Sequence, residues 1–232
     1  IQVADGNLKY SSSEGVLFNK DKTALIHFPL GKDATGYTIP ESVDTIYQRA
    51  FIWYRKTQTI TIPEGVTTIG YEAFFNSSFT EIKLPKTVTE IGVNAFYSCS
   101  WLTNIAVAED NEKYTSIDGV LFNNDKDTLI AYPAGKDATS YTIPDGVTAI
   151  VDNDVFAGCD SLTNITLPES LTSIGDYAFS SAENLTKIQV ADGNLKYSSE
   201  DGVLFNKDKT ALILFPLGKD ATGYTIPESV DT

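Results

Sequence analysis

The sequence predicts a right-handed solenoid of the α/β class, dominated by β-strands, with short helical turns and inserted β-hairpins. Two repeats carry this prediction. A unit of about 23 residues recurs along the chain and is clearest over residues 82–102; this period indicates stacked units that share one core. A longer segment also recurs, because residues 1–45 match residues 188–232 at all but three positions. We therefore expect residues 1–232 to form a single solenoid, right-handed like other parallel crossovers, as part of a longer array.

Each unit begins with a short strand that ends at an anchoring apolar residue. In the clearest unit, Ile82 and Leu84 have the spacing of a strand with one face inward. Pro85 ends this strand, since proline cannot donate to a ladder. Stacking should align these strands in one continuous parallel ladder. The anchors are Val3, Ile39, Ile62, Leu84, Val107, Ile143, Leu167, Val190 and Ile226.

The second half of each unit carries further core positions at fixed distances from the anchor. Val88 and Ile91 are followed by Ala95 and Phe96. This spacing fits a turn of helix that places the phenyl ring in the core, and Gly92 would let the backbone bend just before it. The equivalent rings are Phe51, Phe74, Phe156 and Phe179.

Three longer segments interrupt the short units, at about residues 10–36, 114–140 and 197–223. Each has two apolar runs around a polar Asn/Lys/Asp cluster, which is typical of a β-hairpin. Because isolated hairpins are marginally stable, each insert must bury apolar side chains against the solenoid. In the first insert these are Val16, Phe18, Leu25 and Phe28.

Composition and charge exclude several classes of partner. With 42% hydrophobic and 21% charged residues, the chain has the composition of an ordered protein. The net charge of −14 and the lack of a basic run argue against nucleic acid. No apolar run approaches a membrane span of about 20 residues, so we expect no membrane insertion. The chain opens at Ile1 and stops at Thr232 within repeats and without capping units, which predicts flanking repeats or end-to-end self-association.

Comparison of the copies argues against an enzyme. An active-site residue should not vary among near-identical copies, yet His27 is replaced by Ala131 and Leu214. The chain has one histidine, so Ser–His and Cys–His nucleophiles and histidine zinc sites are not expected. We therefore expect no catalytic residue and no cofactor.

The cysteines and the acidic clusters are expected to be structural. Cys99 and Cys159 occupy one column of the repeat, as buried packing residues do. Two rungs apart, at about 10 Å, they would lie beyond disulfide reach. The acidic clusters at 125–127 and 152–154 offer oxygen ligands for Ca²⁺ but lack the spacing of an EF-hand loop. We expect solvated loop charges there and no metal site.

One set of columns departs from the regular pattern. The position after the core ring holds Phe75 and Tyr97 in consecutive units, and it shrinks to Ala157 and Ser180 downstream. Stacked columns form ridges, and exposed Trp, Tyr and Arg are typical of binding hot spots. The alternative is that these rings only seal the core against neighbouring turns. The candidate partner-binding patch comprises Tyr47, Trp53, Tyr54, Arg55, Phe75, Tyr97 and Trp101.

The repeat resembles that of the BspA-type leucine-rich-repeat family. Residues 82–102 and 165–185 are close to its pattern, roughly L-x-x-I-x-[IL]-P-x-x-V-x-x-I-G-x-x-A-F-x-x-C, and the G-V-L-F-N inserts are similar to inserts of that family. The resemblance implies a leucine-rich-repeat solenoid from a secreted or surface-anchored bacterial protein, and some members act as adhesins. Thr57 in place of the closing Leu and Tyr47 in place of Gly depart from the pattern near residues 46–60.

The function favoured by these observations is a non-enzymatic binding module, extracellular or at the cell surface, that recognises a protein or a glycan. Two alternatives remain open: a passive structural spacer in a larger surface protein, and a non-catalytic part of a secreted enzyme. The near-identity of residues 1–45 and 188–232 favours the spacer, because duplication lengthens an array without adding a site.

Overall fold

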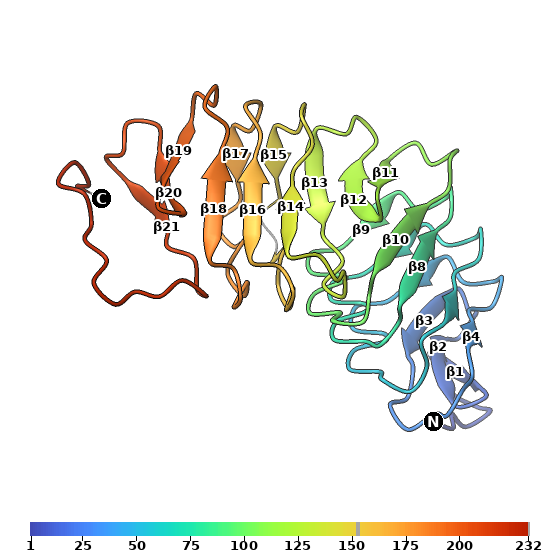
Figure 1. Cartoon of the computed structure of the whole chain (residues 1–232). Helices are drawn as coiled ribbons and strands as arrows, with labels where there is room; N and C mark the ends of the chain where they lie inside the picture. The colour runs from blue at the N-terminus through green and yellow to red at the C-terminus, as the bar shows by residue number, and fades with distance from the viewer. Residues whose placement is uncertain (152–153, 232) are drawn as a thin grey trace.

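The computed structural model of the chain describes residues 1–151 and 154–231. It is an elongated, curved stack of strands with the two termini at opposite ends (Figure 1). The strands follow one another along the stack from β1 near the N-terminus to β21 near the C-terminus. This is the solenoid arrangement that the repeats predict.

All strands are short. In chain order they are β1 Tyr10–Ser13, β2 Val16–Asn19, β3 Ala24–His27, β4 Tyr37–Thr38, β5 Thr45–Ile46, β6 Ile60–Thr61, β7 Thr68–Ile69, β8 Glu81–Leu84, β9 Glu90–Ile91, β10 Asn104–Val107, β11 Tyr114–Ile117, β12 Val120–Asn123, β13 Thr128–Ala131, β14 Ser140–Thr142, β15 Ala149–Ile150, β16 Asn164–Leu167, β17 Ser173–Ile174, β18 Lys187–Val190, β19 Tyr197–Glu200, β20 Val203–Asn206 and β21 Leu212–Leu214.

The strands at the anchor positions pair in parallel, as the repeat predicts. Between β16 and β18, for example, Ile165 aligns with Ile188 and Leu167 with Val190. The ladder is not continuous, however, and in this respect the prediction is wrong. It is divided into three sheets, β4-β6, β8-β10 and β14-β16-β18. The division between β10 and β14 falls where an insert enters the chain.

A second parallel ladder, which was not expected from the sequence, runs through β3, β5, β7 and β9. It aligns Ile46 with Ile69 and Ile69 with Ile91. A matching ladder joins β13, β15 and β17 farther along the chain. These isoleucines were expected as core positions, and the two-residue strands that carry them are too short to show a strand pattern in the sequence.

Each insert forms three antiparallel strands rather than two. In the first, β2 pairs with both β1 and β3, and β3 then pairs in parallel with β5. The strands β11-β12-β13 and β19-β20-β21 repeat the same antiparallel order. In the first two inserts, the third strand therefore joins the insert to the solenoid and supplies support that an isolated hairpin lacks.

The turns that carry the core rings are not helical, so the expected short helical turns are wrong. No helix occurs within residues 1–151 and 154–231, and so no described helix is long or apolar enough to cross a membrane. In the first such turn, Ile52 N donates to Arg49 O, three residues back, whereas Trp53 N donates to Phe75 O of the next unit. Arg49 and Trp53 have φ of 57° and 61°, and these left-handed positions interrupt any right-handed helix.

The buried side chains form two hydrophobic clusters. We call residues 16–107 the first block and residues 120–190 the second block. Within each block, aromatic rings stack from unit to unit, with centroids 5.3 Å apart for Phe51 and Phe74. Stacking of buried rings fixes the spacing of the turns, because close-packed cores tolerate little displacement.

The insert strand β12 joins the two clusters. Leu121 belongs to the cluster of the first block, whereas Val120 and Phe122 face the second block. This division follows from the strand itself, since successive side chains point to opposite faces. The stack therefore continues through the insert.

Candidate ligand-binding surface

Three aromatic side chains from consecutive units form a continuous row on the turns of the first block. The indole of Trp53 meets the Phe75 ring edge-on, with centroids 6.2 Å apart. Phe75 in turn stacks on Tyr97 at 5.0 Å. Backbone hydrogen bonds set this spacing, since Trp53 N donates to Phe75 O and Asn76 N donates to Tyr97 O. We call Trp53, Phe75 and Tyr97 the aromatic row.

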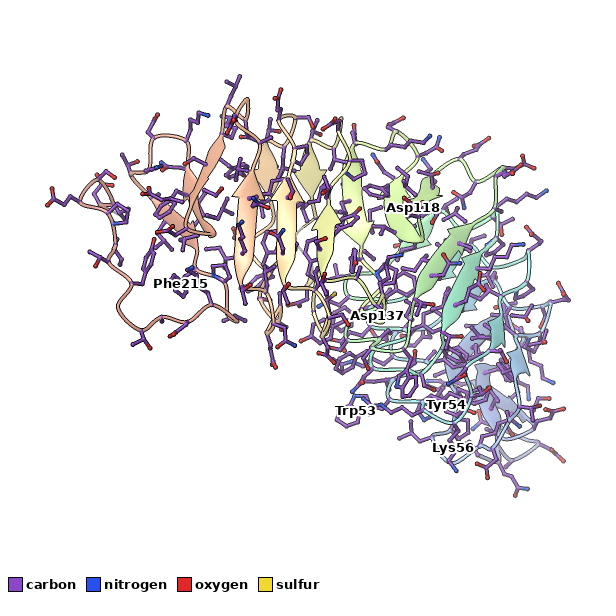
Figure 2. All side chains as sticks on the ribbon, in the orientation of Figure 1. Trp53, Tyr54, Lys56, Asp118, Asp137 and Phe215 are labelled. Atoms are coloured by element: carbon purple, nitrogen blue, oxygen red, sulfur yellow. The ribbon has the colours of Figure 1, made fainter. Side chains whose placement is uncertain are left out.

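Trp53 is the most exposed member of the row and has an unusual backbone. Its side chain is 57% exposed and projects from the edge of the stack (Figure 2). Its φ of 61° lies in the left-handed region, which costs an L-residue about 1–2 kcal/mol. The same column holds Asn76, Ser98 and Gly158, all with positive φ. The other units have small or polar residues at this position, so a large exposed ring there is not required by the fold. This difference points to a role for Trp53 at the surface.

A groove of about 740 Å³ lies between the loops at Lys56 and Trp101. The sequence explains it, because the middle loop, residues 77–79, is one residue shorter than the flanking loops at 54–57 and 99–102. Because the middle loop is shorter, the two flanking loops project beyond it and form the sides of the groove. Trp101, which is 53% exposed, lines this groove. We call it the Trp101 groove. The Trp101 groove was not predicted from the sequence, although the one-residue shortening of the middle loop was a usable signal.

Two exposed cations line the Trp101 groove in an otherwise acidic chain. Lys56 Nζ lies 2.7 Å from Asp33 Oδ1, and Arg55 Nε donates to Asn76 O at 3.3 Å. A terminal guanidinium nitrogen of Arg55 also bonds the Asn76 side chain. Because both cations are exposed, these contacts contribute little to stability. Both cationic side chains remain exposed at the Trp101 groove.

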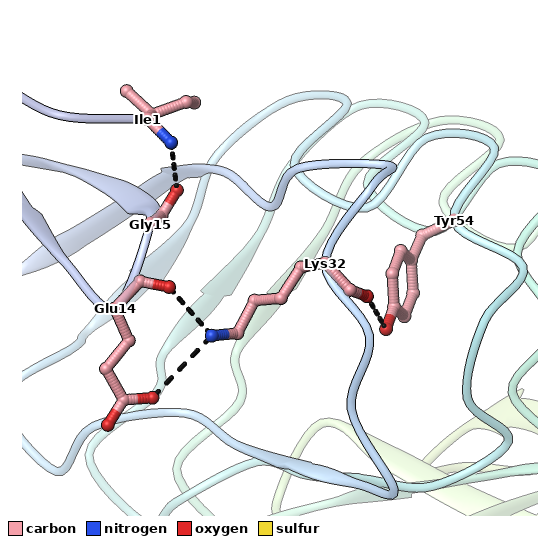
Figure 3. A network of polar contacts seen from close by, with 5 residues as sticks. All are labelled: Ile1, Glu14, Gly15, Lys32 and Tyr54. Atoms are coloured by element: carbon pink, nitrogen blue, oxygen red, sulfur yellow. Dashed lines mark hydrogen bonds and ion pairs between the residues drawn. The ribbon is translucent and has the colours of Figure 1, made fainter.

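Two residues of the predicted partner-binding patch, Tyr47 and Tyr54, lie outside both the aromatic row and the Trp101 groove. Tyr54 is fully buried, with its ring edge-on to Phe28 at 4.6 Å, and its hydroxyl donates to Lys32 O at 2.9 Å (Figure 3). Its assignment to an exposed patch is therefore wrong. Tyr47 is exposed but precedes the turn, and a Cβ on Gly70 would lie only 2.9 Å from the Tyr47 carbonyl carbon. Close packing between units thus explains the glycine at this repeat position.

The aromatic row ends where the second block begins. The Tyr97 hydroxyl lies 3.2 Å from Ser181 Oγ, and Asn94 Nδ2 donates to Asp154 Oδ2 at 3.0 Å. A Cβ on Gly158 would lie 3.2 Å from Ser98 Cα, so the turns at 95–99 and 155–159 are direct neighbours. The insert contributes strands but no turn of this kind.

The cysteines therefore come from neighbouring turns, and the predicted separation of two rungs is wrong. Both thiols are free and buried. Burial raises the pKa of Cys99 to about 11 and also raises the pKa of Cys159. Thiols in such surroundings are unreactive packing groups. His27 lies on β3, where burial lowers its pKa.

The acidic cluster at Asp125–Asp127 is held by local hydrogen bonds. The Asp127 carboxylate accepts from Asn123 Nδ2 at 2.7 Å and from Thr128 Oγ1 at 2.8 Å. These hydrogen bonds lower the pKa of Asp127. Asp152 and Asn153 of the other cluster lie outside the described residues. In the rest of the chain, no three His, Cys, Asp or Glu side chains gather in a group that could hold a metal ion.

Comparison with known proteins agrees with the repeat pattern. The BspA type leucine rich repeat region matches residues 30–135 and 130–213, in six copies. Curated proteins give no match. A leucine rich cell surface protein from Faecalibacterium prausnitzii A2-165 is similar in structure, with 35% identity and a TM-score of 0.59 over 66% of this chain and 40% of that chain.

A second solved structure, a leucine-rich repeat protein from Eubacterium ventriosum ATCC 27560, has 23% identity and a TM-score of 0.57. The similarity covers 79% of this chain and 57% of that chain, and it bears on the fold alone. The present chain thus spans about two fifths of the first relative and somewhat more than half of the second.

Proposed function

Because the chain belongs to the BspA-type leucine-rich-repeat family, we propose that it is a non-catalytic binding module of a bacterial cell-surface or secreted protein. Its ligand is a protein that contacts the aromatic row and the Trp101 groove. The scaffold suits this role, since stacked units give a long rigid surface.

The exposed Trp53 carries the proposal. Its backbone is held in the strained left-handed region, its side chain projects outward, and its ring packs against Phe75, the middle member of the row. Beside it in the chain, Arg55 and Lys56 line a groove that also exposes Trp101. Exposed Trp, Tyr and Arg gathered on one surface are the residues that dominate binding energy at protein interfaces.

A protein ligand is favoured over a glycan by the form of the surface. The aromatic row is formed by side chains that pack against one another, and only Trp53 presents most of its ring to solvent. A glycan would need flat exposed rings beside hydroxyl and amide groups. The Trp101 groove has such groups at Gln58 and Thr59, so glycan binding is the outcome that would redirect the proposal.

The test uses two substitutions to residues that already occur at equivalent positions. Trp53→Ser copies Ser98 and Ser181, and Trp101→Ser copies Ser161. The wild-type chain is applied to an array of extracellular-matrix proteins and to a glycan array, and thermal unfolding is measured in parallel. Each substitution should weaken binding by about tenfold or more without lowering the melting temperature.

Leu195→Ser is the matched control, because Leu195 is 82% exposed and lies far along the chain from the aromatic row. It should leave both binding and melting temperature unchanged. If Trp53→Ser and Trp101→Ser lower stability but keep the affinity, the rings only pack and the binding proposal fails. If the wild-type chain binds nothing on either array, the passive spacer becomes the better account.

A further inference from the structure

The joint between the first and second blocks is built differently from the joints inside a block. Both parallel ladders are interrupted there, since β9 and β13 belong to different sheets, as do β10 and β14. Within the first block, neighbouring turns share backbone hydrogen bonds such as Phe74 N to Ala95 O at 2.9 Å. The matching bond from Phe96 N to Val155 O is not formed, and Val155 O accepts from Tyr132 N of the second insert at 3.4 Å instead.

The stack of core rings is also interrupted at this joint. Phe96 stacks on Phe74 with centroids 5.9 Å apart, and Tyr132 packs on Phe156 at 5.5 Å. Among the described residues no ring contact joins Phe96 to Tyr132, and a cavity of about 30 Å³ is lined by both. Ile91 and Phe96, which line this cavity, are only partly buried. Because close-packed cores resist displacement, a void at one joint marks where the stack deforms most easily.

Side chains close the turn side of the joint, where the backbone bonds are missing. Asn94 Nδ2 donates to Asp154 Oδ2 at 3.0 Å, and Asp154 N donates to Asn94 Oδ1 at 3.2 Å. Asp154 also accepts from Ser180 Oγ, which holds its carboxylate in place. The Tyr97 hydroxyl lies 3.2 Å from Ser181 Oγ. We call the Asn94–Asp154 and Tyr97–Ser181 contacts the latch.

The strand side of the joint is held through the main chain. Ile105 N of β10 donates to Gly119 O of the second insert at 3.0 Å, and Gly135 N donates to Leu102 O at 2.8 Å. Leu121 of β12 is fully buried in the cluster of the first block. In Figure 1 the upright strands of the second block and the tilted β8 and β10 meet at this edge. Any movement between the blocks must therefore turn about the second insert.

We propose that the two blocks are rigid bodies joined by a hinge at the second insert, and that the latch closes this hinge on the turn side. Opening separates Phe96 from Tyr132 and breaks the latch, while the bond from Ile105 N to Gly119 O stays intact. Because water replaces the part-buried hydrogen bonds of the latch, the closed form is only slightly favoured. Hinge movements of packed bodies of this kind occur over microseconds to milliseconds.

The hinge gives the scaffold an adjustable angle between two rigid surfaces. Tyr97 is the last member of the aromatic row and also part of the latch, so opening separates the end of the row from the second block. The proposal rests only on contacts between the blocks, and it holds whether or not the aromatic row binds a ligand.

Distance measurements between two spin labels by pulsed electron paramagnetic resonance test the hinge. Gln48→Cys and Asp176→Cys place the labels at equivalent exposed repeat positions, one in each block. The native thiols are buried and should stay unlabelled. Gln48→Cys with Thr89→Cys is the control pair, because both positions lie in the first block and are exposed. The distance distribution between the blocks should be broader than that of the control pair.

A variant of the latch should open the hinge. Asn94→Asp places a second carboxylate against Asp154, and aspartate tolerates the φ of 57° at this position. Repulsion between the two charges should lengthen the distance between the blocks by about one strand spacing, ~5 Å, or more. Adding Asp154→Asn exchanges the pair and restores a donor opposite an acceptor, so the wild-type distance should return. Tyr97→Phe removes only a hydroxyl and should broaden the distribution while the chain stays folded.

Two results would overturn the proposal. The first is a distribution between the blocks that is as narrow as that of the control pair and unchanged by Asn94→Asp or Tyr97→Phe, because the blocks would then form one rigid body. The second is a lengthening by Asn94→Asp that the exchanged pair does not reverse, because it would come from lost structure and not from the latch.

Discussion

The two blocks share a scaffold and differ in what they display. Both have parallel ladders and stacked core rings, with centroids 5.3 Å apart for Phe51 and Phe74 and 5.2 Å apart for Phe156 and Phe179. The outward columns are aromatic in the first block and small in the second, where the exposed Ser180 follows the core ring of Phe179. Positions that stack inward must be alike in every unit, and only the outward ones are free to acquire a function.

Removal of a stacked core ring should have the largest effect, and it tests whether the two blocks really share a scaffold. Phe74 is fully buried between Phe51 and Phe96, with centroids at 5.3 and 5.9 Å. Phe74→Ala should lower the free energy of unfolding by about 3–5 kcal/mol, since it leaves a cavity in a close-packed stack. Denaturant unfolding measures this, and Phe156→Ala should give a similar loss. A small effect in only one block would mean that its core is not stacked as described.

A side chain added where neighbouring turns pack closely should have the next largest effect on the free energy of unfolding. A Cβ on Gly92 would lie 2.4 Å from Tyr71 N, a backbone atom that cannot move aside. Gly92→Ala should therefore lower the free energy of unfolding by about 2 kcal/mol. Gly31→Ala is the control, because nothing lies within 4 Å of its Cβ position, and its effect should stay within about 0.5 kcal/mol. Equal effects at the two glycines would show that unit-to-unit contact does not set the spacing of the aromatic row.

The buried thiols should make the free energy of unfolding depend on pH, through one cysteine in each block. The pKa of Cys99 rises from 9.0 to about 11 on folding. The neutral thiol is thus favoured in the folded state, and the stability present below pH 9 is lost as the pH rises toward about 11, by about 2 kcal/mol. Denaturant unfolding of the wild type and Cys99→Ala at these two pH values isolates this loss from that of the tyrosines. Cys159→Ala should behave likewise, and identical pH profiles for wild type and variants would contradict the burial of the thiols.

The smallest effect on stability is expected at the exposed indole. Trp53→Asn replaces a strained ring by the residue found at position 76, which tolerates positive φ better. The lost contact with Phe75 offsets this gain, so the melting temperature should change by no more than about 2–4 °C. Thermal unfolding measures it. A large drop would mean that the aromatic row is part of the core and would remove the main difference between the blocks.

Much of the fold could be predicted because the repeat is regular. The columns that hold Val88, Leu84 and the core rings were assigned from spacing alone. Each of these columns is buried in most units. The turns were wrongly predicted to be helical because the spacing of Ala and Phe also suits a helix. In the first two such turns every second backbone N–H bonds to the next unit, and no residue pattern in the sequence indicates this. The second ladder was missed for a similar reason, since two-residue strands carry no periodicity.

The candidate surface was predicted in part. Trp53, Phe75 and Tyr97 meet as a stacked column should, and Trp101 lies on a groove with Arg55. Tyr54 was misplaced, because an aromatic residue in a column of Ser and Cys looks exceptional whether it points outward or inward. Its hydroxyl finds a backbone acceptor at Lys32, which lets the ring be buried.

The sequence by itself determined which residues share a column, and hence the family, the parallel strands and most of the core. Apolar spacing is a one-dimensional property, and stacking copies it from unit to unit. Only the tertiary structure decided which units are neighbours and which columns face outward. The insert between the blocks contributes strands but no turn of the Ala-Phe kind, so the turns at 95–99 and 155–159 come into contact although they are far apart in the chain. The short loop at 77–79 opens the Trp101 groove because the loops on either side project beyond it.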